Sequence, residues 1–358
     1  MDQLLKTLGI VLNATLMYTP PLLFAALGSC CSEKSGVINI GIEGMMTIGA
    51  FTGAAVGYFS GDPWLAFLCA GLAGMVFALI HGFACITCKA DQTISGTAIN
   101  FLASGIAVYV CRLLFAGNTE THPVPNKLPR IFNGLFEWCN ANLGGKWGEA
   151  FAKNGFLDNV FNTYASAYIA FILVLVIWFV FYKTRFGLRL RAVGEHPQAA
   201  DTLGVNVSLV RYICVALSGF LAGLGGASIT LATVSVYRPS IVIGQGFIAI
   251  AAVIFGKFKP QGAMLGCILF GFCNGLKVVV GSSGSIPVNI ISMIPYVVTI
   301  VALILFVGKA HVPAANGKPY IKSKYQKTTR RAQQLAFVNS VNTCRCSDND
   351  SGGNFEAG

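Results

Sequence analysis

Long stretches without a charged residue constrain this chain more than any other feature of its sequence. Residues 164–182 and 213–237 contain no Asp, Glu, Lys or Arg, and a helix of about 20 apolar residues crosses the hydrocarbon core of a bilayer. Only 11% of the residues are charged, about half the share found in soluble domains. A soluble fold would have to bury every such stretch in one core, whereas a membrane accommodates them as helices. The sequence therefore predicts an all-α, polytopic bundle of transmembrane helices.

The hydropathy pattern predicts about nine spans between residues 8 and 308, and the uncertainty of their limits allows about eight to ten. The seventh, 240–256, is the least regular, because it is short and carries Gly244, Gln245 and Gly246. Glycines inside a span are typical of a broken or re-entrant segment that lines a cavity. We therefore expect a discontinuous helix in this part of the bundle.

The distribution of charge predicts the orientation of the spans. The net charge is +11, but it does not indicate a nucleic-acid partner, because Lys and Arg gather in 183–211 and in the tail, as cytoplasmic loops do. The loop 117–163 has mixed charge and is expected on the extracytoplasmic side. We predict a membrane domain at 1–310 and a cytoplasmic tail at 311–358. The tail is polar after residue 325 and is expected to be largely disordered there.

The twelve cysteines do not predict a metal site. Nine of them lie within or beside apolar segments, where a thiol behaves as a small hydrophobic group. Two pairs, Cys85 with Cys88 and Cys344 with Cys346, have the spacing of ligands, but no second Cys or His pair accompanies either. No nucleophile and base occur together, and no glycine-rich loop ends in Gly-Lys-Ser/Thr. We therefore predict no metal, no cofactor and no enzymatic activity of the chain's own.

A carboxylate at membrane depth requires an explanation, because a charge near the middle of a span costs about 2.5–3.5 kcal/mol. Glu43 lies in a run with three glycines and Asn39, which weakens the helix and exposes backbone groups to a ligand, a partner helix or water. The alternative is that Glu43 lies near the interface, where it pairs with Lys34 or caps a broken helix. The sequence leaves both interpretations open.

A second polar cluster begins the fourth predicted span. Gln92, Thr93, Gly96, Thr97 and Asn100 recur at helical spacing and are expected to share one face. Such a face can line a hydrated path, but hydrogen bonding between helices would produce the same pattern. The candidate residues of a substrate path are Asn39, Glu43, Thr97 and Asn100.

Several ordered motifs resemble those of one transporter family. They include Asn39-Ile-Gly-Ile-Glu-Gly44, Gln92-Thr-Ile-Ser-Gly-Thr-Ala-Ile-Asn100 and Gly194-Glu-His-Pro-Gln-Ala-Ala200. The chain resembles permeases of the branched-chain amino acid and ribose-type ABC importers over residues 5–322, and most of all their nucleoside and simple-sugar branch. It departs from the family pattern at Ala90-Asp91, where an Asn is expected before the Gln, and in the tail.

The resemblance implies an importer in the plasma (inner) membrane of a bacterium, with the chain as the smaller of two permease subunits. Its implied partners are a dimer of ATPase subunits, a second and different permease chain, an extracytoplasmic substrate-binding lipoprotein and membrane lipid. The implied substrates are nucleosides or related ribose-bearing and simple-sugar solutes. The polar groups inside the membrane would also permit an ion-coupled secondary transporter or a channel, which is the alternative function.

An importer of this kind needs a cytoplasmic permease segment that docks on the ATPase, and 185–208 is the predicted one. Glu195 is expected in the first turn of a short helix, and Gly204 is expected to end that helix in a left-handed conformation. A solvated basic loop that only sets topology is the alternative, but it does not explain the small residues or the final glycine. The candidate coupling residues are Arg191, Gly194, Glu195, Ala199, Ala200 and Gly204.

The segments 38–44 and 241–246 resemble each other. The predicted spans that contain them run in opposite directions. Both properties are typical of an inverted-topology repeat whose broken segments face a shared path near the membrane centre.

Overall fold

The computed structural model describes residues 2–131, 161–282 and 312–321, together with single residues between 293 and 304. These parts form helices and no β-strand. The bundle consists of α1 (Asp2–Lys34), α2 (Ile42–Ser60), α3 (Pro63–Gly82), α4 (Gln92–Leu114), α8 (Ala165–Lys183), α11 (Val207–Ser228), α12 (Gln245–Phe255) and α13 (Pro260–Ser282). Two single-turn π-helices, Phe83–Thr87 and Ile229–Thr233, extend α3 and α11. Two short helices, α9 (Arg185–Glu195) and α10 (Pro197–Thr202), connect α8 to α11.

Five helical segments within the described residues are long and apolar enough to cross a membrane. They are Leu8–Lys34, Pro63–Thr87, Gln92–Leu114, Ala165–Lys183 and Val207–Thr233. The predicted seventh span is much shorter than a full span, because its helix covers only Gln245–Phe255. The predicted second span begins later than expected, at Ile42, because residues 37–41 are not helical. The ninth predicted span lies mostly outside the described residues.

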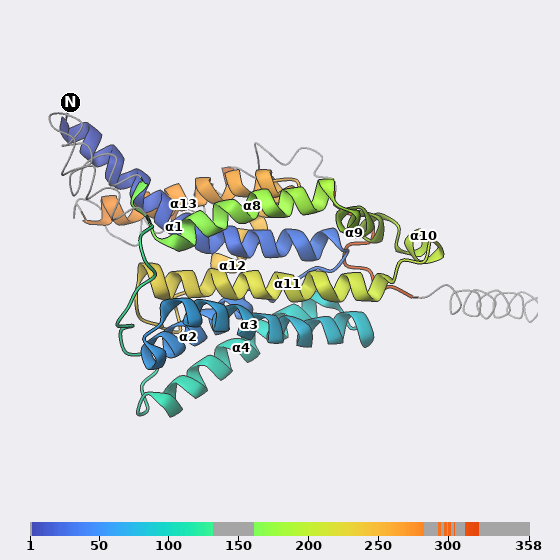
Figure 1. Ribbon diagram of the computed structural model, residues 1–358, viewed down its shortest axis with the longest axis horizontal. Helices are drawn as coiled ribbons and strands as arrows, with labels where there is room; N and C mark the ends of the chain where they lie inside the picture. The colour runs from blue at the N-terminus through green and yellow to red at the C-terminus, as the bar shows by residue number, and fades with distance from the viewer. Residues whose placement is uncertain are drawn as a thin grey trace, which may run out of the picture.

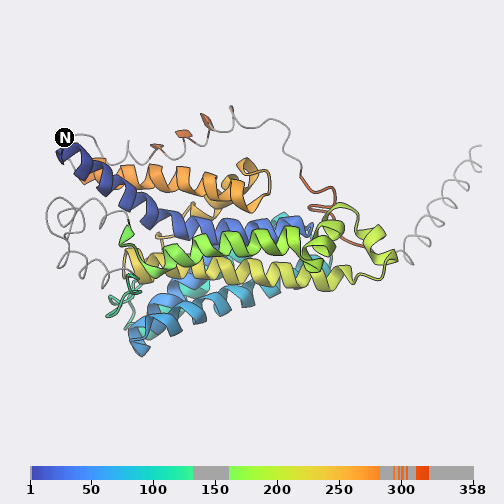
Figure 2. The same cartoon turned by 45° about the horizontal axis from the view of Figure 1, so that its top comes forward.

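Figures 1 and 2 show the long helices side by side, with α11 in the middle of the bundle. The helices α9 and α10 lie at one end, which we call the α9–α10 end, and the amino terminus lies at the other. Residues 117–131 also lie at that opposite end, where Val124 and Leu128 donate backbone hydrogen bonds to Ser235 and Leu231. The described part of the predicted extracytoplasmic loop and the predicted coupling segment are therefore at opposite ends of the bundle.

Side chains just before several helices explain where these helices begin. Asp91 accepts hydrogen bonds from the amides of Thr93 and Ile94 at 2.8 and 3.0 Å, and Asn206 accepts one from Leu209 at 3.1 Å. Each satisfies backbone donors that the first turn of a helix leaves free. The starts of α4 and α11 are thus encoded locally.

Glycines let α2, α3 and α11 approach until their backbones touch. A Cβ on Gly226 would collide with the carbonyl of Met46, and one on Gly223 would collide with the carbonyl of Ala70. Gly49 of α2 faces Gly223 directly. Small residues at such positions are the usual device for packing helices in a membrane, where apolar burial between helices gains little.

Candidate translocation path and coupling segment

The amino ends of two helices, α2 and α12, meet at Glu43. The carboxylate of Glu43, in the first turn of α2, accepts a hydrogen bond from the amide of Gly244 at 3.1 Å. Gly244 has φ +80° and precedes the first residue of α12. A Cβ on Gly246 would lie 2.7 Å from the Cα of Glu43, so glycine is needed for this approach. We call this contact the Glu43 joint.

From the Glu43 joint, α2 and α12 run in opposite directions. The last turn of α2 reaches the opposite end, where Gly57 faces Val124 and Leu231. Just after α12, the carbonyl of Phe258 lies 3.1 Å from the Sγ of Cys30, in the last part of α1 and towards the α9–α10 end. Two half-helices therefore begin at one joint and diverge, which is the arrangement that an inverted repeat requires. The positive ends of the two helix dipoles also stabilise a carboxylate at this place.

Three side chains hold the non-helical segment 35–41 in place. Gln92 accepts a hydrogen bond from the Ile38 amide at 2.7 Å, and a ring nitrogen of His81 lies 3.1 Å from the Ile38 carbonyl. The carboxamide of Asn100 accepts from the Gly44 amide at 2.7 Å and donates to the Ile40 carbonyl at 3.1 Å. Backbone groups that a helix would pair internally are thus paired with side chains, as burial requires.

The four candidate path residues do not have equal environments. Asn39, Glu43 and Asn100 gather around the start of α2. Asn39 is fully buried and donates to the Ser218 hydroxyl at 3.0 Å, and its carbonyl oxygen has no hydrogen-bond partner among the described residues. Thr97 is exposed and donates only to carbonyls of its own helix. The predicted polar face is therefore divided: Gln92 and Gly96 are buried and Asn100 is half-buried, whereas Thr93 and Thr97 are exposed.

The structure shows which groups Glu43 and Lys34 contact. The amino group of Lys34 lies over the rings of Phe181 and Tyr182, at 6.0 and 5.5 Å from their centroids, and the contact made by Glu43 is to Gly244. Glu43 therefore caps the broken helix α12 and does not pair with Lys34, while its second carboxylate oxygen is buried without a hydrogen-bond partner among the described residues. His81, a residue that the sequence analysis did not single out, joins α3 to α4 through Ser95 at 3.0 Å and contacts the Ile38 carbonyl.

The coupling segment consists of two helices rather than one. Thr184 caps α9 through the Gly187 amide at 3.2 Å, and Arg191 lies over the ring of Tyr182 at 5.3 Å. A Cβ on Gly194 would collide with the carbonyl of Lys34. Because only glycine fits there, Gly194 fixes α9 against the end of α1.

Glu195 does not lie in the first turn of a helix, so that prediction is wrong. It is the last residue of α9, and α10 begins at Pro197 because proline lacks the amide that a first turn leaves unpaired. The carboxylate of Glu195 instead accepts from the Ala314 amide at 3.4 Å. This contact joins segments that are 119 residues apart, and no local pattern in the sequence predicts it.

The small residues of α10 divide between two faces. Ala199 is exposed, whereas Ala200 is buried at 2% exposure, so the prediction that both present a surface to a partner is wrong for Ala200. Leu203, just after α10, is 83% exposed. Gly204 has φ +81°, which confirms the predicted left-handed end. The tip of this segment thus exposes an apolar side chain that the sequence analysis did not single out.

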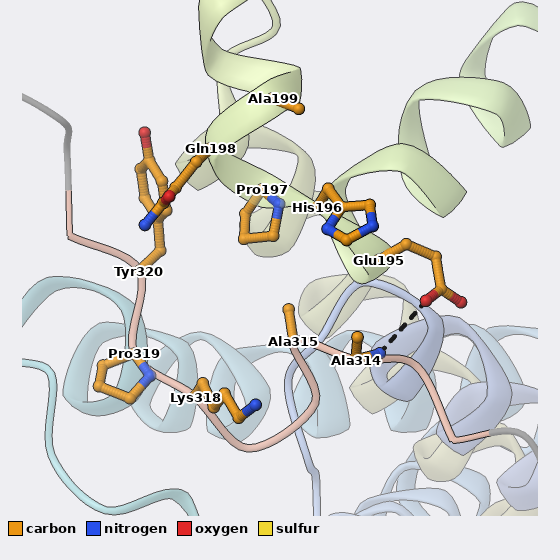
Figure 3. Close-up of a pocket in the computed structure, with 10 residues that line it drawn as sticks. All are labelled: Glu195, His196, Pro197, Gln198, Ala199, Ala314, Ala315, Lys318, Pro319 and Tyr320. Carbon is orange, nitrogen blue, oxygen red and sulfur yellow. Dashed lines mark hydrogen bonds between the residues drawn. The ribbon is translucent and has the colours of Figure 1, made fainter.

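A cleft of about 540 Å³ separates α10 from residues 314–320 (Figure 3). Its lining brings together Glu195, His196, Gln198 and Lys318 with several small or apolar residues. Burial, together with the Asp201 carboxylate, raises the pKa of Tyr320 to about 12, so its phenol is uncharged at neutral pH. Within the described residues, no group of three His, Cys, Asp or Glu side chains is placed to hold a metal ion.

A family model described as "Branched-chain amino acid transport system / permease component" matches residues 11–303. This match covers most of the chain, including both halves of the Glu43 joint and the coupling segment. The chain belongs to this permease family. As a permease it is a multi-pass protein of the bacterial plasma membrane, in agreement with its apolar helices.

Curated permeases share much of its sequence. The guanosine ABC transporter permease NupQ of Bacillus subtilis is 42% identical over 90% of this chain and 99% of its own length. The nucleoside ABC transporter permease NupC of Lactococcus lactis is 40% identical over 89% of this chain and 99% of its own length. A second Bacillus subtilis protein, the guanosine ABC transporter permease NupP, is 25% identical over 83% of this chain and 80% of its own length.

Proposed function

We propose that this permease is one of two different transmembrane subunits of an ATP-driven nucleoside importer. The observation that carries the proposal is the similarity to NupQ and NupC, at 42% and 40% identity over nearly their whole lengths. The greater similarity to NupQ than to NupP, which is from the same organism, supports a pair of unlike permeases, with this chain in the NupQ position. ATP hydrolysis belongs to separate ATPase subunits, and an extracytoplasmic lipoprotein delivers the substrate.

The coupling segment is the proposed docking site for the ATPase. The exposed Leu203 provides an apolar anchor at the tip of α10, and Ala199 lets a partner surface come close to the helix. Gly194 ties α9 to α1, so a force on α10 is transmitted to the bundle rather than absorbed by a loose loop. These contacts support a coupling role, because a basic loop that only sets the topology would not need them.

The proposed substrate path passes the Glu43 joint. Asn39 has an unused, buried carbonyl oxygen, and one carboxylate oxygen of Glu43 is also buried without a hydrogen-bond partner among the described residues. Such groups are costly in an apolar medium and are acceptors for the hydroxyl and amino groups of a nucleoside. Asn100 has a supporting role, because both ends of its amide already bind backbone groups.

Reconstitution of the permease with its partner subunits tests the proposal. Vesicles that contain the complete assembly should take up radiolabelled guanosine or adenosine only with ATP and the binding lipoprotein, and excess glucose should not compete. Uptake driven by an ion gradient without ATP would instead support the secondary transporter. ATP-dependent uptake of glucose in preference to nucleosides would support an ATP-driven importer but contradict nucleosides as its substrates.

A further inference from the structure

Residues 312–320 form a turn that lies across the α9–α10 end of the bundle, and we call them the C-terminal strap. Asn316 and Lys318 donate backbone hydrogen bonds to Pro313 and Ala315 at 3.0 and 3.2 Å, and Gly317 has φ +76°. Ala315 is buried at 5% exposure. The strap is thus a folded part of the protein, packed against its neighbours.

The strap is attached to the end of α9. The amide of Ala315 donates to the carbonyl of Gly194 at 2.9 Å, and the amide of Ala314 donates to the carboxylate of Glu195 at 3.4 Å (Figure 3). The strap is therefore joined to the last turn of α9, which leads into α10.

The other side of the strap rests on the segment 35–41. A Cβ on Gly36 would lie 3.1 Å from the carbonyl oxygen of Ala315, and one on Gly317 would lie 3.0 Å from the Cδ1 of Ile38. Asn316 also interacts with the carboxylate of Glu33, near the end of α1. Since segment 35–41 leads directly into α2, the strap lies between the coupling helices and the Glu43 joint.

Arg211 connects the strap to α11. Its side chain is 2% exposed and donates from Nη1 to the carbonyl of Lys318 at 3.2 Å, while Nη2 faces Gly36. Nε and Nη2 of Arg211 have no hydrogen-bond partner among the described residues. A buried, incompletely paired charge costs free energy. Stability alone therefore does not explain an arginine at this position.

We infer that the strap and Arg211 are positioning elements that transmit movement of α9 and α10 to segment 35–41, and so to the Glu43 joint. The inference rests on the proposed ATP-driven import. The contacts form a continuous series from Gly194 through Ala315 to Gly36, and from Ile40 through Asn100 to the start of α2. Loss of the strap uncouples hydrolysis from transport and leaves ATPase docking intact, because Leu203 and Ala199 are not part of it.

A matched pair of truncations tests this inference in the reconstituted assembly. A chain that ends after residue 311 lacks the strap, and a chain that ends after residue 321 keeps it. The shorter chain should retain bound ATPase and hydrolyse ATP, but its uptake per ATP should fall about tenfold or more, whereas the longer chain should match the full chain. Equal uptake per ATP in both truncations would overturn the inference, as would loss of the bound ATPase from the shorter chain alone.

Point variants decide the matter if the shorter chain does not accumulate in the membrane. Arg211→Met should lower uptake per ATP without lowering the melting temperature, and Arg211→Lys, which keeps a charged donor, should restore much of the coupling. Gly317→Val should also uncouple transport because its side chain meets Ile38. Gly61→Val places the same side chain at a glycine of similar φ, +70°, with nothing within 4 Å, and should not. Normal coupling in both Arg211→Met and Gly317→Val overturns the inference, whereas failure of the wild-type assembly to use ATP for uptake overturns the proposed function instead.

Discussion

The carboxylate of Glu43 and the backbone amide of Gly244, 201 residues apart, form a hydrogen bond at 3.1 Å inside the bundle. This bond makes the amino end of α12 depend on α2, so the two half-helices share one fixed point. A substitution that removes the acceptor should release α12. A substitution that keeps an acceptor of the same length should not.

Glu43→Ala is therefore expected to lower the initial rate of ATP-dependent uptake about tenfold or more, since a hydrogen bond to a charged group contributes about 1.5–3 kcal/mol. Glu43→Gln retains an oxygen acceptor and should keep at least about a third of the wild-type rate. Both variants should be compared at equal abundance in the membrane. Equal rates for Ala and wild type would show that the joint does not matter for transport.

Asn100→Leu is expected to destabilise the permease as well as to slow uptake. It removes the acceptor for the Gly44 amide and the donor to the Ile40 carbonyl, and each unpaired buried group costs about 1–3 kcal/mol. Thr97→Val, one turn earlier and exposed, is the control and should leave the melting temperature unchanged. A normal melting temperature for Asn100→Leu would contradict the assigned supporting role.

Leu203→Asp should weaken binding of the ATPase subunits without changing the abundance of the permease, because the side chain is 83% exposed. Leu203→Met preserves an apolar surface and is the matched control. Affinity purification of the assembly through a tag on the ATPase measures the effect. Undiminished recovery of Leu203→Asp would remove Leu203 from the docking surface.

Gly223→Ala should lower the abundance and thermal stability of the permease, because the added Cβ collides with the carbonyl of Ala70 and the helices must separate. Gly105→Ala, on α4 with nothing within 4 Å of the added atom, should be neutral or stabilising by up to about 1 kcal/mol. Thermal unfolding in detergent measures both. The pair distinguishes close packing from a general intolerance of glycine replacement.

The broken helices were predictable from sequence because glycines and polar groups interrupt an apolar pattern near Glu43 and Gly244. The left-handed end at Gly204 was predictable for a local reason as well, since glycine is the residue best suited to positive φ. What these residues contact was not predictable. The partner of Glu43 lies about 200 residues away, and helical spacing placed Thr97 beside Asn100 without showing that only Asn100 turns inward.

The same limit applies at the coupling segment. Composition favoured a docking role for Ala199 and Ala200, but the packing of α10 against its own chain buries Ala200 and leaves Leu203 outside. Glu195 was predicted in the first turn of a helix because a carboxylate is favourable there. Instead, Pro197 sets the start of α10, and Glu195 binds the strap. Contacts between residues that are far apart in the sequence can be identified only from the structure.

The backbone contacts at Gly49, Gly223 and Gly226 also determine which parts of the permease are free to move during transport. Helices whose main chains touch cannot slide or tilt past each other without first separating, so α2, α3 and α11 behave as one rigid frame. A cycle between inward-open and outward-open shapes therefore has to displace other elements against this frame. The short helix α12 touches this frame through its amino end at the Glu43 joint, so its other end can be displaced while the backbone contacts within the frame stay intact.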